Sequence, residues 1–162
     1  MPKRRMEENL IFIAVAVSTM IVVSMLLYTA VTSPPSESFS VISILGPNQT
    51  ATDYPEEVNV GETIDMYVLV ENHENRAEYY VVRFKLGDVT TDISNDHPAS
   101  LSTRKSYQKI LSDGESWQFP VDVSINERGN DYRLIFELWR YNENTGDIEY
   151  TGNWVQIWLD VR

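Results

Sequence analysis

The sequence contains no cysteine and only two histidines, His73 and His97, among its 162 residues. Without cysteine the chain has no disulfide scaffold, no thiolate zinc site and no cysteine nucleophile. Basic residues are also scarce, since 13 Lys and Arg stand against 24 Asp and Glu and the formal net charge is −11. Nucleic-acid binding requires clustered Lys and Arg, so we expect no nucleic-acid partner.

Glycine is equally scarce, and the seven glycines are dispersed so that none lies within five positions of another. This spacing excludes the G-x-G-x-x-G dinucleotide fingerprint, the P-loop and the G-x-S-x-G nucleophile elbow. The His73-Glu74 pair begins like the zinc-protease motif H-E-x-x-H, but Ala77 occupies the position of its second histidine. We therefore expect no enzyme: no catalytic residue, no cofactor, no metal site and no small-molecule substrate.

One long apolar run dominates the first fifth of the chain. The 22 residues from Leu10 to Val31 carry no charge, and as a helix they would extend about 33 Å, enough to cross a bilayer core. Three basic residues precede the run within the first five positions, and the next one is Arg76. By the positive-inside rule, residues 1–9 are cytoplasmic, residues 10–31 span the cell membrane once, and the C-terminal domain is extracellular.

Two alternatives for this run stay open. A cleaved secretory signal has an apolar region of about 7–15 residues, which is shorter than the run here. A filament subunit would use residues 10–31 as fibre core after processing, but pilin-like leaders usually carry Gly or Ala after the basic cluster, and here the cluster continues Met6-Glu7-Glu8. The mature N-terminus would distinguish these alternatives from an anchor.

The rest of the chain has the pattern of an all-β domain. Residues 32–38 contain two prolines and four serines or threonines, which predicts a short solvated stalk. From residue 39 onward apolar residues alternate with polar ones, the period of half-buried strands, and Gly- and Asn-rich turns separate the runs. We expect an extracellular immunoglobulin-like β-sandwich over residues 39–162, with seven or eight strands. The expected strands cover residues 39–45, 56–60, 63–72, 78–86, 105–111, 116–125, 132–141 and 150–161.

Two connections in this domain allow a more detailed prediction. Residues 88–104 show no clear period, and we expect a long loop that crosses between the sheets. A two-residue turn at Thr145-Gly146 would place Tyr141 opposite Tyr150, Glu137 opposite Trp154 and Arg133 opposite Trp158, all on the face opposite the apolar row of the strand. A longer turn with a bulge would shift this register.

The candidate sites are few. Asn48 begins the triplet Asn48-Gln49-Thr50, an N-glycosylation acceptor on the exported side. Five aromatic residues predicted to point outward form a candidate interaction surface for sugars or proteins: Trp139, Tyr141, Tyr150, Trp154 and Trp158. The oxygen-rich loops at 88–96 and 142–149 could hold calcium, but neither has an ordered calcium-loop spacing, and we interpret them as turns. His73 is likewise interpreted as a turn residue.

An ordered set of short motifs resembles a known family. The motifs are Leu45-Gly46-Pro47-Asn48, Asp53-Tyr54-Pro55, Val60-Gly61-Glu62 and Glu71-Asn72-His73-Glu74, followed by a tyrosine-rich strand at 78–82. The set is similar to an uncharacterised, largely archaeal membrane-protein family with an extracellular β-rich domain of unknown function. The resemblance covers roughly residues 41–162 and implies an archaeal envelope setting and an immunoglobulin-like fold, but no activity or catalytic residue.

Taken together, these features favour a membrane-anchored cell-envelope protein that interacts with the lipid bilayer and with a protein partner. Its ectodomain would act as an interaction module or accessory subunit in a membrane or cell-surface assembly. The alternatives are a pilin-like filament or surface-layer subunit, and a carbohydrate-binding module that uses the outward aromatics.

Overall fold

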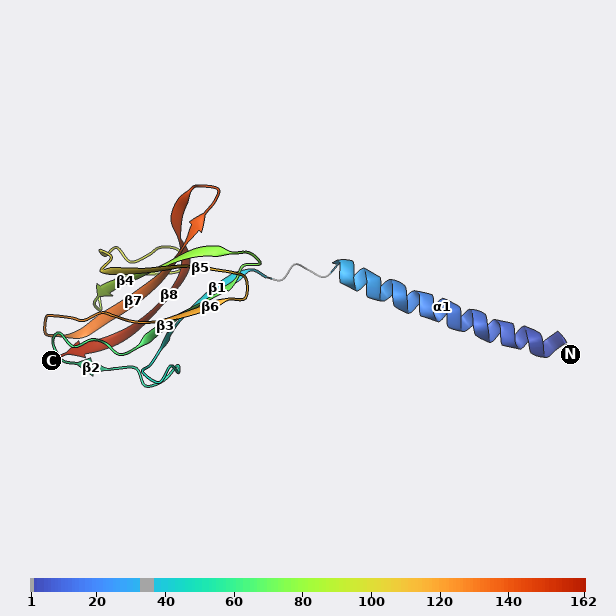
Figure 1. Cartoon of the computed structure of the whole chain (residues 1–162), viewed down its shortest axis with the longest axis horizontal. Helices are drawn as coiled ribbons and strands as arrows, with labels where there is room; N and C mark the ends of the chain where they lie inside the picture. The colour runs from blue at the N-terminus through green and yellow to red at the C-terminus, as the bar shows by residue number, and fades with distance from the viewer. Residues whose placement is uncertain (1, 33–36) are drawn as a thin grey trace. The chain divides into compact units, whose positions relative to one another are not determined.

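The computed structural model describes residues 2–32 and 37–162, and the chain divides into two compact units, residues 1–36 and 37–162 (Figure 1). Residues 33–36 of the predicted stalk lie outside the described residues.

The first unit is the helix α1 (Pro2–Thr32). Its stretch Asn9–Thr29 is long and apolar enough to cross a membrane, and the side chains of that stretch are exposed. The hydroxyls of Ser18 and Thr19 donate to backbone carbonyls four residues earlier, so an apolar environment leaves neither hydroxyl unsatisfied. An apolar N-terminal helix is thus confirmed, and it extends past both predicted bounds, 10 and 31.

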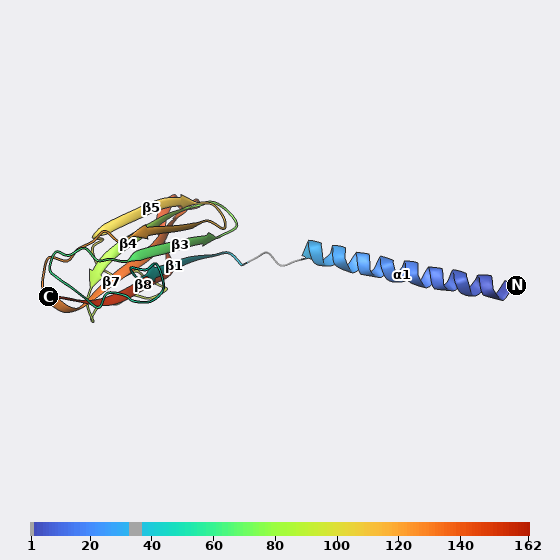
Figure 2. The same cartoon turned by 60° about the horizontal axis from the view of Figure 1, so that its bottom comes forward.

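The second unit is a β-sandwich, as the sequence predicted. One sheet has the strand order β1-β3-β6 and the other the order β2-β8-β7-β4-β5, and Figure 2 shows β1 and β3 side by side. All pairings are antiparallel except that of β2 with β8. The strands are β1 (Phe39–Leu45), β2 (Glu57–Val58), β3 (Tyr67–His73), β4 (Glu78–Gly87), β5 (Lys105–Leu111), β6 (Ser116–Pro120), β7 (Gly129–Asn142) and β8 (Asp147–Val161).

The period-two pattern produces the core between the sheets. Alternate residues of β3 and β4 turn inward, and the side chains of Val68, Val70, Tyr80 and Val82 are fully buried there. β7 is the neighbour of β4 in the same sheet, so the inward side chains of both strands enter the same core. Burial of such large apolar side chains supplies about 1.5–3 kcal/mol each and is the main stabilising contribution to this fold.

The connection 88–104 differs from the prediction. It joins β4 to β5, which are neighbours in one sheet, so it does not cross between the sheets. It contributes Ile93 and Ala99 to a second apolar cluster around Ile135 of β7. Residues 88–104 are here called the covering loop, because they bury part of the outer face of the five-stranded sheet. Residues 88–104 show no period because the loop packs through isolated apolar side chains and not as a strand.

Candidate interaction surface on the outer face of the five-stranded sheet

The β7–β8 hairpin positions the predicted aromatic surface, and Figure 1 shows its turn standing clear of the sandwich. Arg133 faces Trp158 and Glu137 faces Trp154, as predicted, but Tyr150 faces Trp139 and not Tyr141. The register changes because the turn is longer than two residues.

The longer turn and a bulge together explain the register. Asn142 pairs with Asp147, so four residues form the turn, and Gly146 donates its amide to the carbonyl of Asn142 at 2.8 Å. Between Tyr150 and Trp154, three residues of β8 then oppose one residue of β7. Gly152 in this bulge has φ +83°, and a Cβ there would lie 2.7 Å from the carbonyl oxygen of Asn95 in the covering loop. The bulge therefore fits against the covering loop only with glycine.

Glu137 is the centre of a buried polar network on this outer face. Its carboxylate accepts from Lys85 Nζ at 2.9 Å, from the backbone amide of Ala99 at 2.7 Å and from Trp139 Nε1 at 2.9 Å. The Glu137 side chain is completely buried and that of Lys85 is 6% exposed. A buried carboxylate is tolerated only when its oxygens are paired and hydrogen-bonded, as they are here.

The same network fixes the covering loop. Lys85 Nζ donates to the carbonyl of Ala99 at 2.7 Å, and the Tyr150 hydroxyl donates to the carbonyl of Ser94 at 2.9 Å. Arg133 donates to the carbonyl of Thr91 at 2.5 Å. Burial raises the pKa of Tyr150 from 10.0 to about 12, so its hydroxyl stays protonated, and able to donate, to a higher pH than that of an exposed tyrosine. These contacts bind the covering loop to β4, β7 and β8.

The five predicted aromatics are consequently divided between two environments. Trp139, Tyr150 and Trp154 are partly covered, and the rings of Trp139 and Tyr150 lie 5.5 Å apart. Tyr141 and Trp158 remain exposed, at 39% and 43%. They lie toward opposite ends of the hairpin, so the exposed aromatic surface is not continuous. Binding at these residues stays a prediction.

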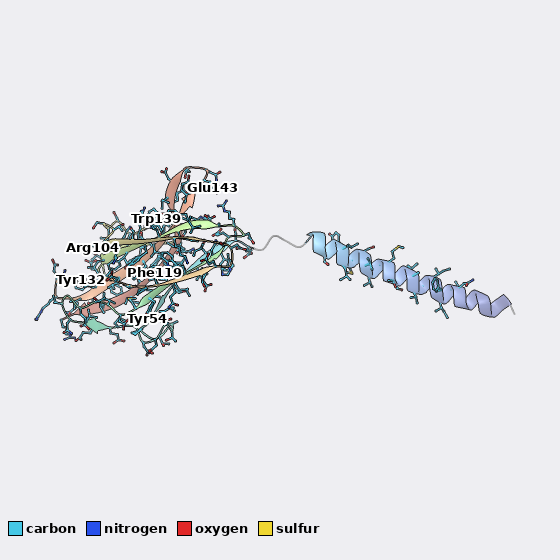
Figure 3. The ribbon with its side chains drawn as sticks, viewed as in Figure 1. Tyr54, Arg104, Phe119, Tyr132, Trp139 and Glu143 are labelled. Carbon is cyan, nitrogen blue, oxygen red and sulfur yellow. The ribbon has the colours of Figure 1, made fainter. Side chains whose placement is uncertain are left out.

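Two hollows in the sandwich were not visible in the sequence because distant segments form them. One, of about 690 Å³, lies beside Trp158 and is lined by residues 53–56 and 157–160. The other, of about 880 Å³, is bounded by the covering loop, the 123–127 segment and Tyr132. Figure 3 shows Arg104 and Tyr132, two residues that line the larger hollow, at one end of the sandwich.

The remaining candidate residues lie in turns, except His73, which is the last residue of β3. Asn48 is exposed beside Gln49, which has φ 59°, so the acceptor triplet is accessible and its glycosylation stays a prediction. Asp88 Oδ1 accepts from the amide and hydroxyl of Thr90 at 2.8 and 2.7 Å, the bonding of a turn. Among the described residues no three His, Asp or Glu side chains gather as metal ligands. The prediction of His73 as a turn residue was wrong: it pairs with Phe39 of β1 and stacks on its ring, with centroids 4.7 Å apart, and this contact extends the strand to His73.

These features define a β-sandwich domain preceded by an apolar helix. The chain belongs to the family described as Domain of unknown function (DUF1616), which matches residues 33–160. The expectation of a family of unknown function is thereby confirmed. No curated protein matches the chain.

Solved structures resemble the fold at low sequence identity. A β-glucosidase from Listeria innocua in complex with isofagomine has a TM-score of 0.47 and 15% identity over 76% of this chain, which spans only 16% of the enzyme chain. A chain from the human complex of zinc 2-glycoprotein and prolactin inducible protein has a TM-score of 0.48 and 10% identity, over 79% of this chain and 98% of that one. The soluble domain of PmoD from a Methylocystis species has a TM-score of 0.36 and 13% identity, over 78% and 94%.

Proposed function

We propose that the protein is anchored in the membrane of an archaeal cell by α1 and displays its β-sandwich outside the cell as an interaction module or accessory subunit of an envelope assembly. The observation that carries the anchor is the exposure of every side chain from Asn9 to Thr29, an uncharged stretch of α1. An exposed apolar surface of that length is costly in water and favourable in lipid. The sequence resemblance supports the archaeal setting, and the basic residues that precede the apolar stretch of α1 support the outward orientation of the sandwich.

The interaction role is supported by the ectodomain itself. Its buried polar side chains are engaged in structure. Lys85 and Glu137 hold the covering loop on the sheet. Asn72 donates to the carbonyls of Arg76 and Leu111, and Glu78 accepts from Arg76. Tyr141 and Trp158 are large aromatic side chains left exposed on an acidic domain, and aromatic anchors are enriched in protein interfaces. The carbohydrate alternative receives less support, since a sugar platform needs exposed aromatic rings, and Trp139 and Trp154 are partly covered while Trp158 is exposed.

The test uses the full-length chain in native membranes. We expect it to resist extraction at alkaline pH and to lose its ectodomain when protease is added to intact cells. Purification in mild detergent should then recover a partner in stoichiometric amount. The test variant is Ile21→Arg, which places a charge in the apolar stretch of the helix. It should weaken membrane retention by about 2.5–3.5 kcal/mol relative to the unaltered chain. A lone monomer from native membranes, or an ectodomain that protease never reaches, would contradict the proposal.

The filament alternative has a separate readout. A filament subunit would be processed near the basic cluster, so mass spectrometry of the mature chain would find a new N-terminus close to Met6 and not the original one. An intact N-terminal segment would favour the anchor.

A further inference from the structure

The hollow of about 880 Å³ is formed by three segments that are far apart in the sequence. They are the end of β4 with the start of the covering loop, the end of the covering loop with the start of β5, and the segment 123–127 with Tyr132. Figure 3 shows Arg104 and Tyr132 at this end of the sandwich. Pockets that hold small ligands measure about 300–1,000 Å³, so the hollow has the size of a ligand site.

The floor of the hollow is apolar. Phe84 and Ile125 belong to the core between the sheets and are 4% and 5% exposed, whereas the other apolar residues of the lining are half-buried. The apolar lining residues are Phe84, Leu86, Leu101, Val123, Ile125 and Tyr132. A ligand that covers their remaining apolar surface gains about 25 cal/mol for each Å² removed from water.

Hydrogen bonds hold the walls of the hollow in place. The amide of Arg104 donates to the carbonyl of Phe84 at 2.9 Å, which joins the start of β5 to β4. The amide of Gly61 donates to the carbonyl of Ile125 at 2.8 Å and so fixes the segment 123–127. The covering loop is fixed by the buried network around Glu137. Because the walls are held before a ligand arrives, binding requires little ordering of the chain.

Three of the five charged residues in the lining already have neighbours within the domain. Lys105 contacts Asp122 at 2.7 Å. Asp88 accepts the hydrogen bonds of its own turn, which hold its pKa below the usual range. Asp92 lies 3.6 Å from His97. These three side chains are therefore engaged by the protein itself.

The other two charged residues of the lining, Arg104 and Glu127, are not engaged. Neither side chain makes a hydrogen bond or an ion pair with another of the described residues. Three uncharged polar side chains of the lining, those of Ser100, Ser124 and Asn126, are equally without a partner in this part of the chain. The lining thus offers one guanidinium group, one carboxylate and three hydrogen-bonding groups around an apolar floor.

This set of groups distinguishes between classes of ligand. An anion such as phosphate would pair with Arg104 but would also face the carboxylate of Glu127, and a polyamine would meet the opposite conflict. A wholly apolar molecule would cover both charges without pairing them, which is costly. A zwitterion with an apolar body and amide groups complements all of these groups, and a short apolar peptide with free ends is such a molecule.

We propose that the hollow binds a short apolar peptide whose two ends are free. Its terminal carboxylate would accept a pair of hydrogen bonds from Arg104, and its terminal ammonium group would pair with Glu127. Its amides would bond to Ser100, Ser124 and Asn126, and its side chains would lie on the apolar floor. This inference goes beyond the proposed function, because it gives the domain a small ligand whether or not the chain has a protein partner.

The test measures binding of trivaline to the full-length chain in phosphatidylcholine nanodiscs by isothermal titration calorimetry, with empty nanodiscs as the blank. Three control peptides each remove one feature: trivaline amide lacks the carboxylate, acetyl-trivaline lacks the ammonium group, and triserine lacks the apolar side chains. We expect the first two to bind about three- to tenfold more weakly than trivaline, since Arg104 and Glu127 are exposed. Triserine should bind at least about tenfold more weakly.

Two variants assign the ends of the peptide. Arg104→Ala should weaken trivaline binding about three- to tenfold and leave the binding of trivaline amide unchanged, because the amide lacks the group that Arg104 holds. Glu127→Gln should act in the same way toward trivaline and acetyl-trivaline. The matched controls are Arg128→Ala and Glu143→Gln, which alter exposed residues outside the lining. Both should bind trivaline normally.

Hydrogen exchange gives the location, since bound trivaline should slow exchange in residues 100–105 and 123–127 and not along β1. The proposal is wrong if trivaline does not bind, if triserine binds equally well, or if Arg104→Ala and Glu127→Gln bind trivaline as the unaltered chain does. It is also wrong if Arg104→Ala loses as much affinity for trivaline amide as for trivaline. Protection confined to residues outside the hollow would place the peptide elsewhere and would likewise overturn it.

Discussion

The buried pair of Lys85 and Glu137 provides a quantitative test of what holds the covering loop. Lys85→Met removes the ammonium group from a side chain that is 6% exposed and leaves a fully buried carboxylate. Breaking a buried ion pair by removing one partner costs about 3–5 kcal/mol. Because Glu137 keeps the donors of Ala99 and Trp139, we expect a loss near the lower end, about 3 kcal/mol. That is a large share of the about 5–15 kcal/mol typical of a whole domain.

Lys105→Met is the matched control, since it makes the same substitution in the same sheet. Lys105 contacts Asp122 at 2.7 Å, but the two side chains are 37% and 78% exposed, and an exposed pair contributes about 0–1 kcal/mol. The free energy of unfolding is measured by urea titration of the full-length chain in detergent, followed by tryptophan fluorescence. Hydrogen exchange reports separately on residues 93–101, which should open first in the Lys85→Met variant because Lys85 Nζ holds the carbonyl of Ala99.

Equal losses in the two variants would refute the reasoning, because they would show that burial does not govern the energy of these pairs. A third variant, Lys85→Met with Glu137→Gln, removes the buried charge while keeping an oxygen acceptor for the amide of Ala99. It should recover part of the stability lost in Lys85→Met. If it is less stable than the single variant, the cost arises from packing and not from an unpaired charge.

Three further predictions concern other parts of the ectodomain. Gly152→Ala should destabilise more than Gly146→Ala in urea titrations, because both glycines have positive φ, which costs about 1–2 kcal/mol for alanine, but only at Gly152 does a Cβ meet a backbone oxygen, that of Asn95 at 2.7 Å. Burial raises the pKa of Tyr80 from 10.0 to about 12; the unfolded chain therefore ionises first, so stability is full below pH 10 and falls as the pH rises toward about 12, and Tyr80→Phe should flatten this part of the stability profile. Asn48→Gln should lower the mass of the chain purified from its native membranes by the mass of one glycan, as intact-mass spectrometry would show, and an unchanged glycan mass would contradict glycosylation there.

Local pattern was sufficient for most of the fold. The alternation in 78–86 and 105–111 predicted β4 and β5 to within a residue. Successive side chains of a strand point to opposite faces, so a half-buried strand has alternating apolar and polar residues in its sequence. The ends of other strands were less predictable: the strand expected at 63–72 begins only at Tyr67, and Thr63 makes an isolated bridge with Ser124. Pairing partners, and not the alternation, decide where such a strand begins.

The outer face needed contacts that no local pattern contains. Periodicity correctly assigned Trp139 and Trp154 to the face opposite the core row, but it could not show that the covering loop lies over that face. The bulge at Gly152 depends on Asn95, which is distant in the sequence. A prediction of sidedness is therefore sound for these strands, while a prediction of exposure requires knowledge of what lies above them.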